Sequence, residues 1–329
     1  MPCGKVTFYC EITAGIMNIL LIGGTGLVGS YLLPQLVKEG HEVYALTRGA
    51  SKIDKIRDIG AHGILGDILE PQAFIGELDE KPDFIILLAM PGITPGKRIS
   101  KKRKAALKAE TIGFFRNSMD LAIQFNAPII LPSGTSYQTE HGETADETWP
   151  IRRAGLTQVG SETDEMVNRA VSTGKPKIIQ LIYGRIYGNG GLFRSQYEML
   201  KKNRYKIIGK GENYIPVIHA RDAANAIIKS IEKKPFGEKF IIADDAPVKL
   251  RDFTNYMADL MDSKRPGSIP GTIVKMALGK DIYEVISMNC MVSNKKAKSI
   301  LGWHPEYPSF LTGLKHTIKE MGENQPYFM

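Results

Sequence analysis

The sequence of 329 residues predicts an α/β protein, a doubly wound parallel sheet with a smaller C-terminal α/β lobe. Up to about Gly190, short apolar runs alternate with segments of helical spacing, a rhythm typical of a parallel sheet covered by helices on both faces. A glycine-rich segment separates the first apolar run from the first helical segment, as it does where such sheets bind phosphate groups. After Gly190, clusters of glycine and polar residues interrupt shorter elements, which indicates the smaller lobe.

Six apolar runs are expected to form the main sheet. They cover residues 18–22, 42–47, 63–66, 84–89, 129–133 and 178–182. The run 84–89 is continuously apolar, as a strand buried on both faces should be. Helices are predicted at 27–39, 53–59, 102–125 and 162–172, and further strands at 217–219 and 240–242.

The domain boundaries follow from this rhythm. Residues 1–16 are interpreted as an extension, because Met17 is followed directly by the first apolar run. Residues 17–187 are predicted to form the main domain, with parts of 215–245 returning to it. Residues 188–329 are predicted to form mainly the smaller lobe.

Composition and charge narrow the classes of partner. The net charge of +8 is compatible with nucleic acid, but no nucleic-acid-binding motif is present, so a basic protein that handles anionic small molecules is the better interpretation. No apolar run approaches the roughly 18 residues that span a membrane. The three cysteines show no metal-ligand spacing and the six histidines are scattered, which predicts no metal site and a reduced cytoplasmic setting.

The strongest motif is the run from Gly23 to Gly29, which contains Gly24-x-Gly26-x-x-Gly29 between a predicted strand and a predicted helix. Glycines let the backbone turn sharply and approach a pyrophosphate, and the helix that follows presents its free N–H groups to it. The run therefore predicts a dinucleotide cofactor, held by Gly23, Thr25, Gly26, Leu27, Val28 and Gly29.

The end of the second predicted strand bears on the choice of cofactor. A site for NAD(H) has an acidic residue there, whereas this strand ends in Thr47 and Arg48. Arg48 can pair with a 2′-phosphate and Thr47 can donate a hydrogen bond, so the sequence favours NADP(H) over NAD(H). The alternative is that Arg48 is a solvated surface residue.

From Met17 to about Gly313 the chain resembles the extended short-chain dehydrogenases/reductases, the NAD-dependent epimerase/dehydratase family. The resemblance is carried, in order, by the glycine run, Gly66-Asp67-Ile68, Leu87-Leu88-Ala89, Leu131-Pro-Ser133-Gly-Thr-Ser-Tyr137, Gly184-Arg-Ile-Tyr-Gly188, Val217-Ile-His219 with Asp222, and Leu301-Gly-Trp303-x-Pro305. It implies a Rossmann-type domain and a C-terminal substrate-binding lobe. It also implies substrates such as nucleotide sugars or other small carbonyl and hydroxyl compounds, and a possible homodimer.

The resemblance assigns roles residue by residue. Ser133 takes the place of the catalytic serine or threonine that orients the substrate. The other cofactor contacts that it implies are Asp67, Ile68, Leu88, Ala89 and Met90, with Gln158 able to bond a ribose.

The chain departs from the family at its catalytic pair. No Tyr-x-x-x-Lys occurs in residues 138–175, and counting back from Glu162 places Ala154 and Gln158 at the tyrosine and lysine positions. Alanine cannot transfer a proton, and loss of a positioned acid or base costs about 10²–10⁴ in rate. Three outcomes stay open: another donor such as Tyr137, a reaction that needs little proton transfer from the protein, or a catalytically silent NADP(H)-binding regulatory or scaffold protein.

The substrate side is predicted from basic and polar residues. The basic segment 97–104 follows a Pro/Gly loop and can close over an anionic substrate; the alternative is a solvated helix start. His219 is open to two interpretations, a buried histidine bonded to the backbone or a substrate contact. The full set of candidate substrate-binding residues is Ser133, Thr135, Tyr183, Arg185, Arg194 and His219. The enzyme expected from these residues is a reductase, dehydratase or epimerase.

Overall fold

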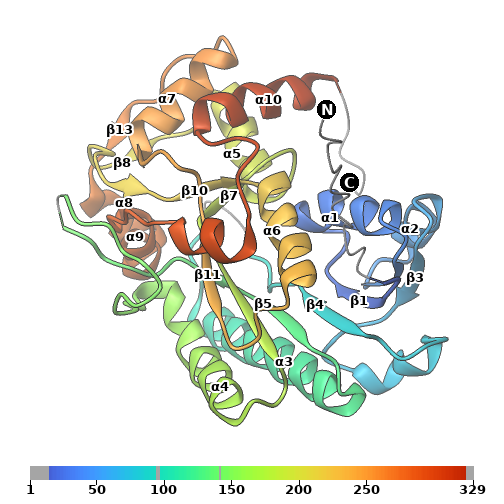
Figure 1. Cartoon of the computed structure of the whole chain (residues 1–329). Coiled ribbons are helices and arrows are strands. Elements are labelled where there is room, and N and C mark those ends of the chain that lie inside the picture. Colours follow the sequence, from blue (N-terminus) through green and yellow to red (C-terminus); the bar gives the residue numbers. More distant parts are fainter. Residues whose placement is uncertain (1–14, 94–96, 141, 324–329) are drawn as a thin grey trace, which may run out of the picture.

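The computed structural model describes residues 15–93, 97–140 and 142–323 (Figure 1). Its centre is a seven-stranded parallel sheet with the strand order β11-β6-β5-β4-β1-β2-β3. The strands are β1 (Asn18–Ile22), β2 (Glu42–Thr47), β3 (His62–Leu65), β4 (Phe84–Leu87), β5 (Ile129–Gly134), β6 (Ile178–Tyr183) and β11 (Lys239–Ile242). The predicted fold class is confirmed. The strand order reverses between β1 and β4, the switch point at which such sheets bind ligands.

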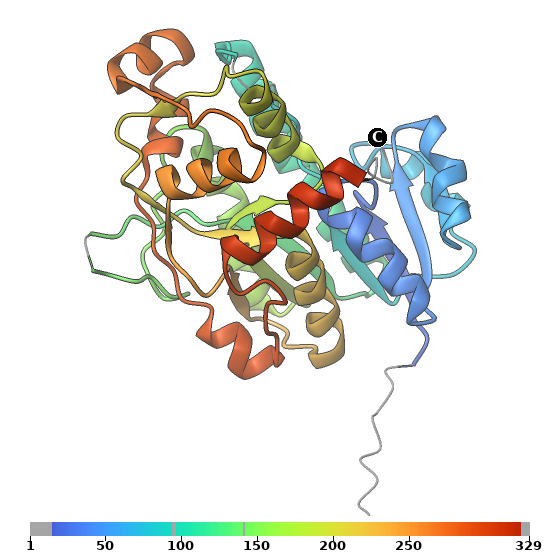
Figure 2. The same ribbon diagram turned by 90° about the horizontal axis from the view of Figure 1, so that it is seen from above.

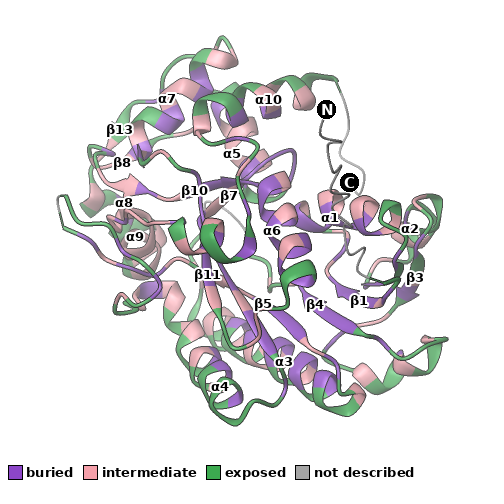
Figure 3. Cartoon of the chain, viewed as in Figure 1, coloured by how far each residue is buried: buried purple, intermediate pink, exposed green. Residues whose placement is uncertain are grey.

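Helices cover both faces of the sheet because its central strands are apolar on both faces. Ile19 and Leu21 pack on one face, while Leu20 and Ile22 pack on the other, and all four are at most 1% exposed. The first face is covered by α1 (Leu27–Lys38), α2 (Ile53–Asp58) and α6 (Ala220–Lys233). The second face is covered by α3 (Lys101–Phe125) and α4 (Gly160–Thr173). Figure 3 shows the buried strands between helices whose outer sides are exposed.

The predicted boundaries differ from the structure by a few residues at most in the main sheet. β4 ends at Leu87 rather than at residue 89, because the N–H groups of Leu88 and Ala89 both donate to the carbonyl oxygen of Ile22. The chain therefore turns toward β1 at this point. This turn brings Ala89 against the glycine run.

The C-terminal lobe is built from short elements around its own core. Its strands pair in three two-stranded sheets: β7 (Arg185–Tyr187) with β10 (Val217–His219), β8 (Ile207–Ile208) with β13 (Ser268–Ile269), and β9 (Tyr214–Ile215) with β12 (Val248–Lys249). Its helices are α5 (Gly191–Lys201), α7 (Leu250–Leu260), α8 (Gly271–Leu278), α9 (Lys280–Ser287) and α10 (Phe310–Glu323). Phe193, Phe253, Met257 and Leu314 form its core.

The remaining elements are single turns. They are η1 (Ala50–Lys52), η2 (Pro71–Ala73), η3 (Ile75–Glu77), η4 (Gly155–Val159) and the π-helical turn η5 (Ala297–Leu301). Among them, η4 matters for function because it carries the segment in which the catalytic pair is missing. No helix in the described ranges is both long and apolar enough to cross a membrane.

The C-terminal half is tied to the main domain at several places. β11 adds the edge strand next to β6, and α6 packs on the face of α1. The Trp303 side chain is fully buried in the main core, and its indole N–H donates to the carbonyl of Asp222 at 3.0 Å. Figure 2 shows α10 reaching from the lobe to α1, where the Tyr31 hydroxyl donates to Glu320 at 2.7 Å.

Buried acidic groups in this region predict a pH-dependent stability. The Tyr187 hydroxyl donates to Asp244 at 3.4 Å, and both side chains are buried. Burial, and then the charge of Asp222, raises the pKa of Asp244 from 3.8 to about 8. The folded chain therefore holds a proton that the unfolded chain has released, so the free energy of unfolding falls as the pH rises toward 8.

We expect Asp244→Asn to remove this slope. Between pH 6.5 and pH 8 the wild type should lose up to about 1.4 kcal/mol of stability per pH unit, and the variant should lose much less. His219 affects both proteins alike: burial lowers its pKa from 6.5 to about 3, so it is neutral in the folded state and partly protonated in the unfolded state only at the lower end of this window. Urea unfolding at several pH values measures the slopes, and parallel slopes for the two proteins would contradict the prediction.

Candidate functional site

The glycine run forms a tight turn between β1 and α1. Gly23 has a φ of +98°, and a Cβ at this position would lie 2.5 Å from the backbone nitrogen of Ala89. A Cβ on Gly29 would lie 2.4 Å from the carbonyl oxygen of Gly24, so glycine also allows α1 to approach the turn. No side chain caps the start of α1, which leaves its first N–H groups free of side-chain partners. These features fit a pyrophosphate cradle.

Except for Gln158, which lies on η4, the residues predicted to contact the cofactor lie at the carboxyl ends of four neighbouring strands, β4, β1, β2 and β3. Ala89 lies against the glycine turn, and the exposed side chain of Met90 follows it. Ile68 is 2% exposed and packs in the core, so only its backbone is available to a ligand. The arrangement brings the predicted cofactor residues to one edge of the sheet.

Arg48 lies at the end of β2 with most of its side chain exposed. Its guanidinium is 3.7 Å from the carboxylate of Asp67, which follows β3. Thr47, the last residue of β2, is buried, and its hydroxyl accepts a hydrogen bond from the N–H of Gly49. The end of β2 thus presents a cation that is shared with an acidic neighbour.

A cleft of about 520 Å³ opens beside the end of β5. Its volume is within the range of small-molecule sites, roughly 300–1,000 Å³. Ser133, Thr135 and Gln158 line it, and so does Met90, so it adjoins the cofactor edge of the sheet. Its other walls come from the first turns of α3, from η4 and from Asp281 on α9.

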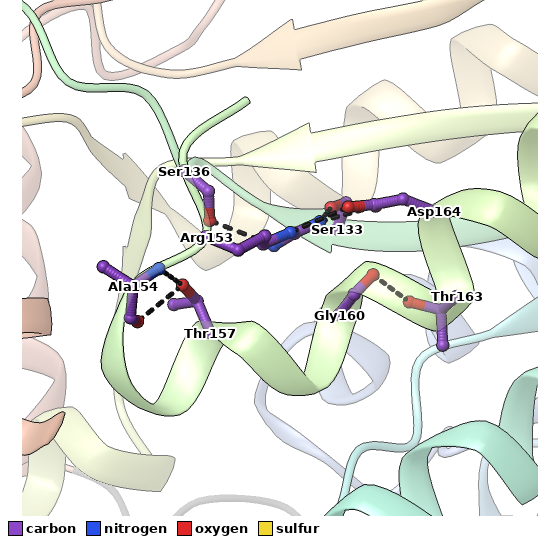
Figure 4. Close-up of polar contacts among 8 residues, drawn as sticks. All are labelled: Ser133, Ser136, Arg153, Ala154, Thr157, Gly160, Thr163 and Asp164. Carbon is purple, nitrogen blue, oxygen red and sulfur yellow. Dashed lines mark hydrogen bonds and ion pairs between the residues drawn. The ribbon is translucent and has the colours of Figure 1, made fainter. Parts of the chain in front are cut away.

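Arg153 is the central polar residue of this cleft. It extends from the loop before η4 to a position between Ser133 on β5 and Asp164 on α4 (Figure 4). Its guanidinium donates to both carboxylate oxygens of Asp164, at 2.8 Å and 2.6 Å, to the Ser136 hydroxyl at 3.0 Å and to the Ser133 hydroxyl at 3.3 Å. The side chains of Arg153 and Asp164 are only 13% and 17% exposed. A largely buried cation is therefore fixed beside the serine.

Two glycines allow this arrangement. A Cβ on Gly160 would lie 2.8 Å from the guanidinium carbon of Arg153, so glycine makes room for the arginine at the start of α4. Gly155 has a φ of +54°, and a Cβ there would lie 2.1 Å from the carbonyl oxygen of Asp281. The η4 turn thus packs directly against α9. Thr157 closes the turn, with its hydroxyl bonded to both the N–H and the carbonyl of Ala154.

Arg153 does not restore the missing proton donor. Arginine keeps its proton in proteins, so it cannot act as a general acid, but it supplies hydrogen bonds and positive charge. Ala154 contributes only a methyl group. The site is therefore suited to stabilising negative charge on an oxygen near Ser133.

The structure corrects the expectation that Tyr137 serves as the proton donor. Its side chain is 1% exposed and packs with Ala145, Ile182 and Cys290, and it does not line the cleft. Burial raises the pKa of the Tyr137 hydroxyl above its usual value, and the hydroxyl has no hydrogen-bond partner. The Tyr137 hydroxyl is therefore poorly placed to serve a molecule in the cleft.

Four candidate substrate residues are not among the described residues that line the cleft. Tyr183 is buried in the main core, and burial lowers the pKa of Arg185 from its usual value. Arg194 donates to the side chain of Asn189 at 3.0 Å. His219 is fully buried at the start of α6, where its Nδ1 accepts from the N–H of Arg221 at 3.1 Å. The alternative in which His219 is a buried histidine bonded to the backbone is therefore correct.

The basic segment is only partly at the cleft. α3 starts at Lys101, with Ser100 as its N-cap. Arg103 bonds to Glu110 and to the carbonyl of Gly92 rather than to the cleft. Lys104 lines the cleft, as does Lys108 four residues later, and the two form ion pairs with Asp281 and Glu162.

The comparisons with known proteins agree with the fold and the cradle. The model of the NAD dependent epimerase/dehydratase family matches residues 19–243, which is most of the chain. The chain belongs to this family. Within the described residues, no group of three or more His, Cys, Asp or Glu side chains could hold a metal ion.

Proteins similar to this chain cover most of its length. The 3-diazoavenalumate denitrifying reductase of a Streptomyces species is 23% identical over 314 residues, which cover 91% of this chain and 99% of that protein. The structure of human epimerase family protein SDR39U1 with NADPH has a TM-score of 0.74 at 17% identity and covers 92% of this chain and 99% of that chain. The Thermotoga maritima UDP-glucose 4-epimerase with UDP-glucose has a TM-score of 0.75 at 19% identity, with 93% and 99% covered. At these identities the two structures show a shared fold.

Sequence reasoning missed Arg153, although it lies next to the alanine that marks the missing tyrosine. A signal for it exists in the chain: an arginine followed by Gly155, Gly160 and Asp164. The spacing has meaning only once the turn η4 is known. Without it, the arginine resembles its exposed neighbour Arg152.

Proposed function

We propose that the chain is an NADPH-dependent reductase of small carbonyl compounds, acting in the cleft beside β5. The observation that carries this proposal is the contact between Arg153 and Ser133, which places two hydrogen-bond donors at the end of β5. The family supports nicotinamide chemistry, and a relative that matches 91% of the chain is named a reductase. The missing tyrosine argues against the family's standard acid/base mechanism.

The residues present fit the cofactor. The turn at Gly23 and Gly29 has no room for a Cβ, as a close backbone approach to pyrophosphate requires. Arg48 would bind the 2′-phosphate, and exposed Gln158 would bond the nicotinamide ribose. When bound, NADPH supplies a hydride to the substrate.

The chain's own residues act on the substrate oxygen. Ser133 and Arg153 would donate hydrogen bonds to the carbonyl oxygen, and these bonds strengthen as negative charge develops on it. Fixed donors of this kind are worth about 10²–10³ in rate. Asp164 and Ser136 hold the guanidinium in place before the substrate arrives, so little reorganisation is needed. The proton that completes the alcohol would come from water, because the described residues of the cleft include no tyrosine or histidine and its two lysines are ion-paired on α3.

The proposal is tested by following NADPH consumption by the full chain with a panel of small aldehydes and ketones. We expect consumption with at least one class, and native mass spectrometry of the protein should detect bound NADP(H). If NADPH binds but no carbonyl compound consumes it, the chain is instead a cofactor-binding regulator. The two readings are separated because binding and consumption are measured independently.

The preference for NADPH leads to a separate prediction for Arg48. Arg48→Ala should lower the ratio of NADPH to NADH affinity about tenfold or more, since a charge-assisted contact to the 2′-phosphate is lost. Arg57→Ala is the matched control, because Arg57 is also an exposed arginine but lies on α2 and pairs with Asp54. Calorimetric titration with each cofactor measures the ratio. An unchanged ratio in Arg48→Ala would mean that another group reads the phosphate.

A further inference from the structure

We propose that the substrate of this cleft is an amphipathic carboxylic acid, with an apolar body and one carboxylate, rather than a nucleotide sugar. This inference rests on the proposed function and names its substrate class. It is drawn from three properties of the cleft: its apolar walls, the two lysines on α3 and the small contribution of the C-terminal lobe.

The apolar walls are open to solvent. Met90 is 50% exposed and Ile93 is 40% exposed, and both line the cleft. Large apolar side chains that gather around a ligand-sized cleft mark a binding surface, since water is a poor partner for them. The apolar side chains lining the rest of the cleft include Leu107, Phe115, Leu156 and Val159.

Lys104 and Lys108 place two positive charges on one wall. They are four residues apart on α3, so they lie on the same face of the helix, and like charges at this spacing repel each other. Asp281 and Glu162 each pair with one of them and offset this repulsion. An ammonium group has three donors, and each lysine side chain is still 42% or more exposed. Both lysines can therefore bind a further carboxylate.

The lobe provides little for a nucleotide. Among the described residues that line the cleft, Asp281 is the only one from beyond Gly188, and it already pairs with Lys104. Arg194, a basic residue of α5, bonds to Asn189 instead. A uridine diphosphate group carries a polar base besides its two phosphates, and the lysines could pair with the phosphates but the mostly apolar walls offer little to the base. A compact acid with an apolar body needs only the walls described above.

The cleft holds two pairs of hydrogen-bond donors, and their positions also fit such an acid. Ser133 and Arg153 lie at the end of β5, and Lys104 and Lys108 lie on α3, on another wall of the same cleft. A molecule that carries its carbonyl at the first set and its carboxylate at the second would lay its apolar part along the side chains between them. The charge of the acid is then satisfied without displacing Arg153 from Asp164.

The test is calorimetric titration of the full chain in excess NADP⁺ with three probes: 3-phenylpropanoate, its amide and UDP-glucose. The acid and the amide share an apolar body and differ in charge. We expect the acid to bind about tenfold or more tightly than the amide, and more tightly than UDP-glucose. The double variant Lys104→Met, Lys108→Met should bind the acid no better than the amide. Lys102→Met is the control, because Lys102 is exposed on the same helix turn but does not line the cleft.

Equal binding of acid and amide, no binding of either, or tighter binding of UDP-glucose would overturn the inference. So would a double variant that keeps the preference for the acid. Failure of the proposed function gives a different result: the acid binds as expected, but no carbonyl compound consumes NADPH. Conversely, consumption with neutral carbonyl compounds and no preference for the acid would leave the reductase in place and reject the substrate class.

Discussion

Replacing Arg153 with alanine should lower kcat by about 10²–10³ while leaving the affinity for NADPH unchanged. The guanidinium lies beside the Ser133 hydroxyl, where it would face the oxygen that gains charge during hydride transfer. It makes no contact with the glycine turn. The effect should therefore appear in the chemical step, and steady-state kinetics with a reactive carbonyl compound measures it.

Two further variants make this result interpretable. Alanine at position 153 leaves the largely buried Asp164 without its partner, which can destabilise the fold by about 3–5 kcal/mol. Arg153→Lys keeps the charge but not the fork that reaches both carboxylate oxygens and Ser133, so it should fold and still be slow. Arg152→Ala changes the exposed neighbour and should have normal kinetics. Normal kcat in Arg153→Lys and Arg153→Ala would contradict the assigned role.

Replacing Gly23 with alanine should weaken the affinity for NADPH about 100-fold or more. The residue has a φ of +98°, and the new methyl group would collide with the backbone of Ala89 at 2.5 Å. Either the turn opens or the end of β4 moves, and both changes destroy the cradle. Two backbone segments cannot give way as a flexible side chain can, so the cost exceeds the roughly 1–3 kcal/mol of ordinary overpacking.

Gly40→Ala separates the effect of a positive φ from the effect of the collision with Ala89. Gly40 has a φ of +88°, but no atom lies within 4 Å of the Cβ that alanine would add. In this variant only the unfavourable backbone conformation lowers the free energy of unfolding, by about 1–2 kcal/mol, and NADPH should bind normally. Thermal unfolding and cofactor titration of both variants give the comparison. Equal behaviour of Gly23→Ala and Gly40→Ala would show that close approach to Ala89 is not what the cradle requires.

The sequence was sufficient for the fold and the cradle because both depend on local patterns. The apolar runs alternate with helices, and the glycine run lies between a strand and a helix, so neighbours in sequence define the geometry. Predicted and observed strand boundaries differ where groups far apart in the sequence form hydrogen bonds. β4 ends early because two of its following N–H groups find the carbonyl of Ile22, more than 60 residues away.

The catalytic side could not be predicted in the same way. Tyr137 is buried against Ala145 and Cys290, and no local pattern reveals a contact that spans more than 150 residues. Arg153 acquires its meaning from Gly160, Asp164 and Ser133, which come from one helix and one strand that meet only in the folded chain. The sequence located the gap left by tyrosine and lysine. The structure was needed to show which side chain lies beside it.

The most direct test of the account is transfer of deuterium from NADPH labelled at its transferable hydrogen to a carbonyl compound. The full chain, Arg152→Ala and Arg153→Lys would each be incubated with the labelled cofactor and a panel of aldehydes and ketones, with and without a carboxylate. Mass spectrometry should find deuterium on the former carbonyl carbon with the wild type and Arg152→Ala, at a rate about 10²–10³ lower with Arg153→Lys. Tight binding of NADPH without transfer to any member of the panel would contradict the account and identify the chain as a cofactor-binding regulator.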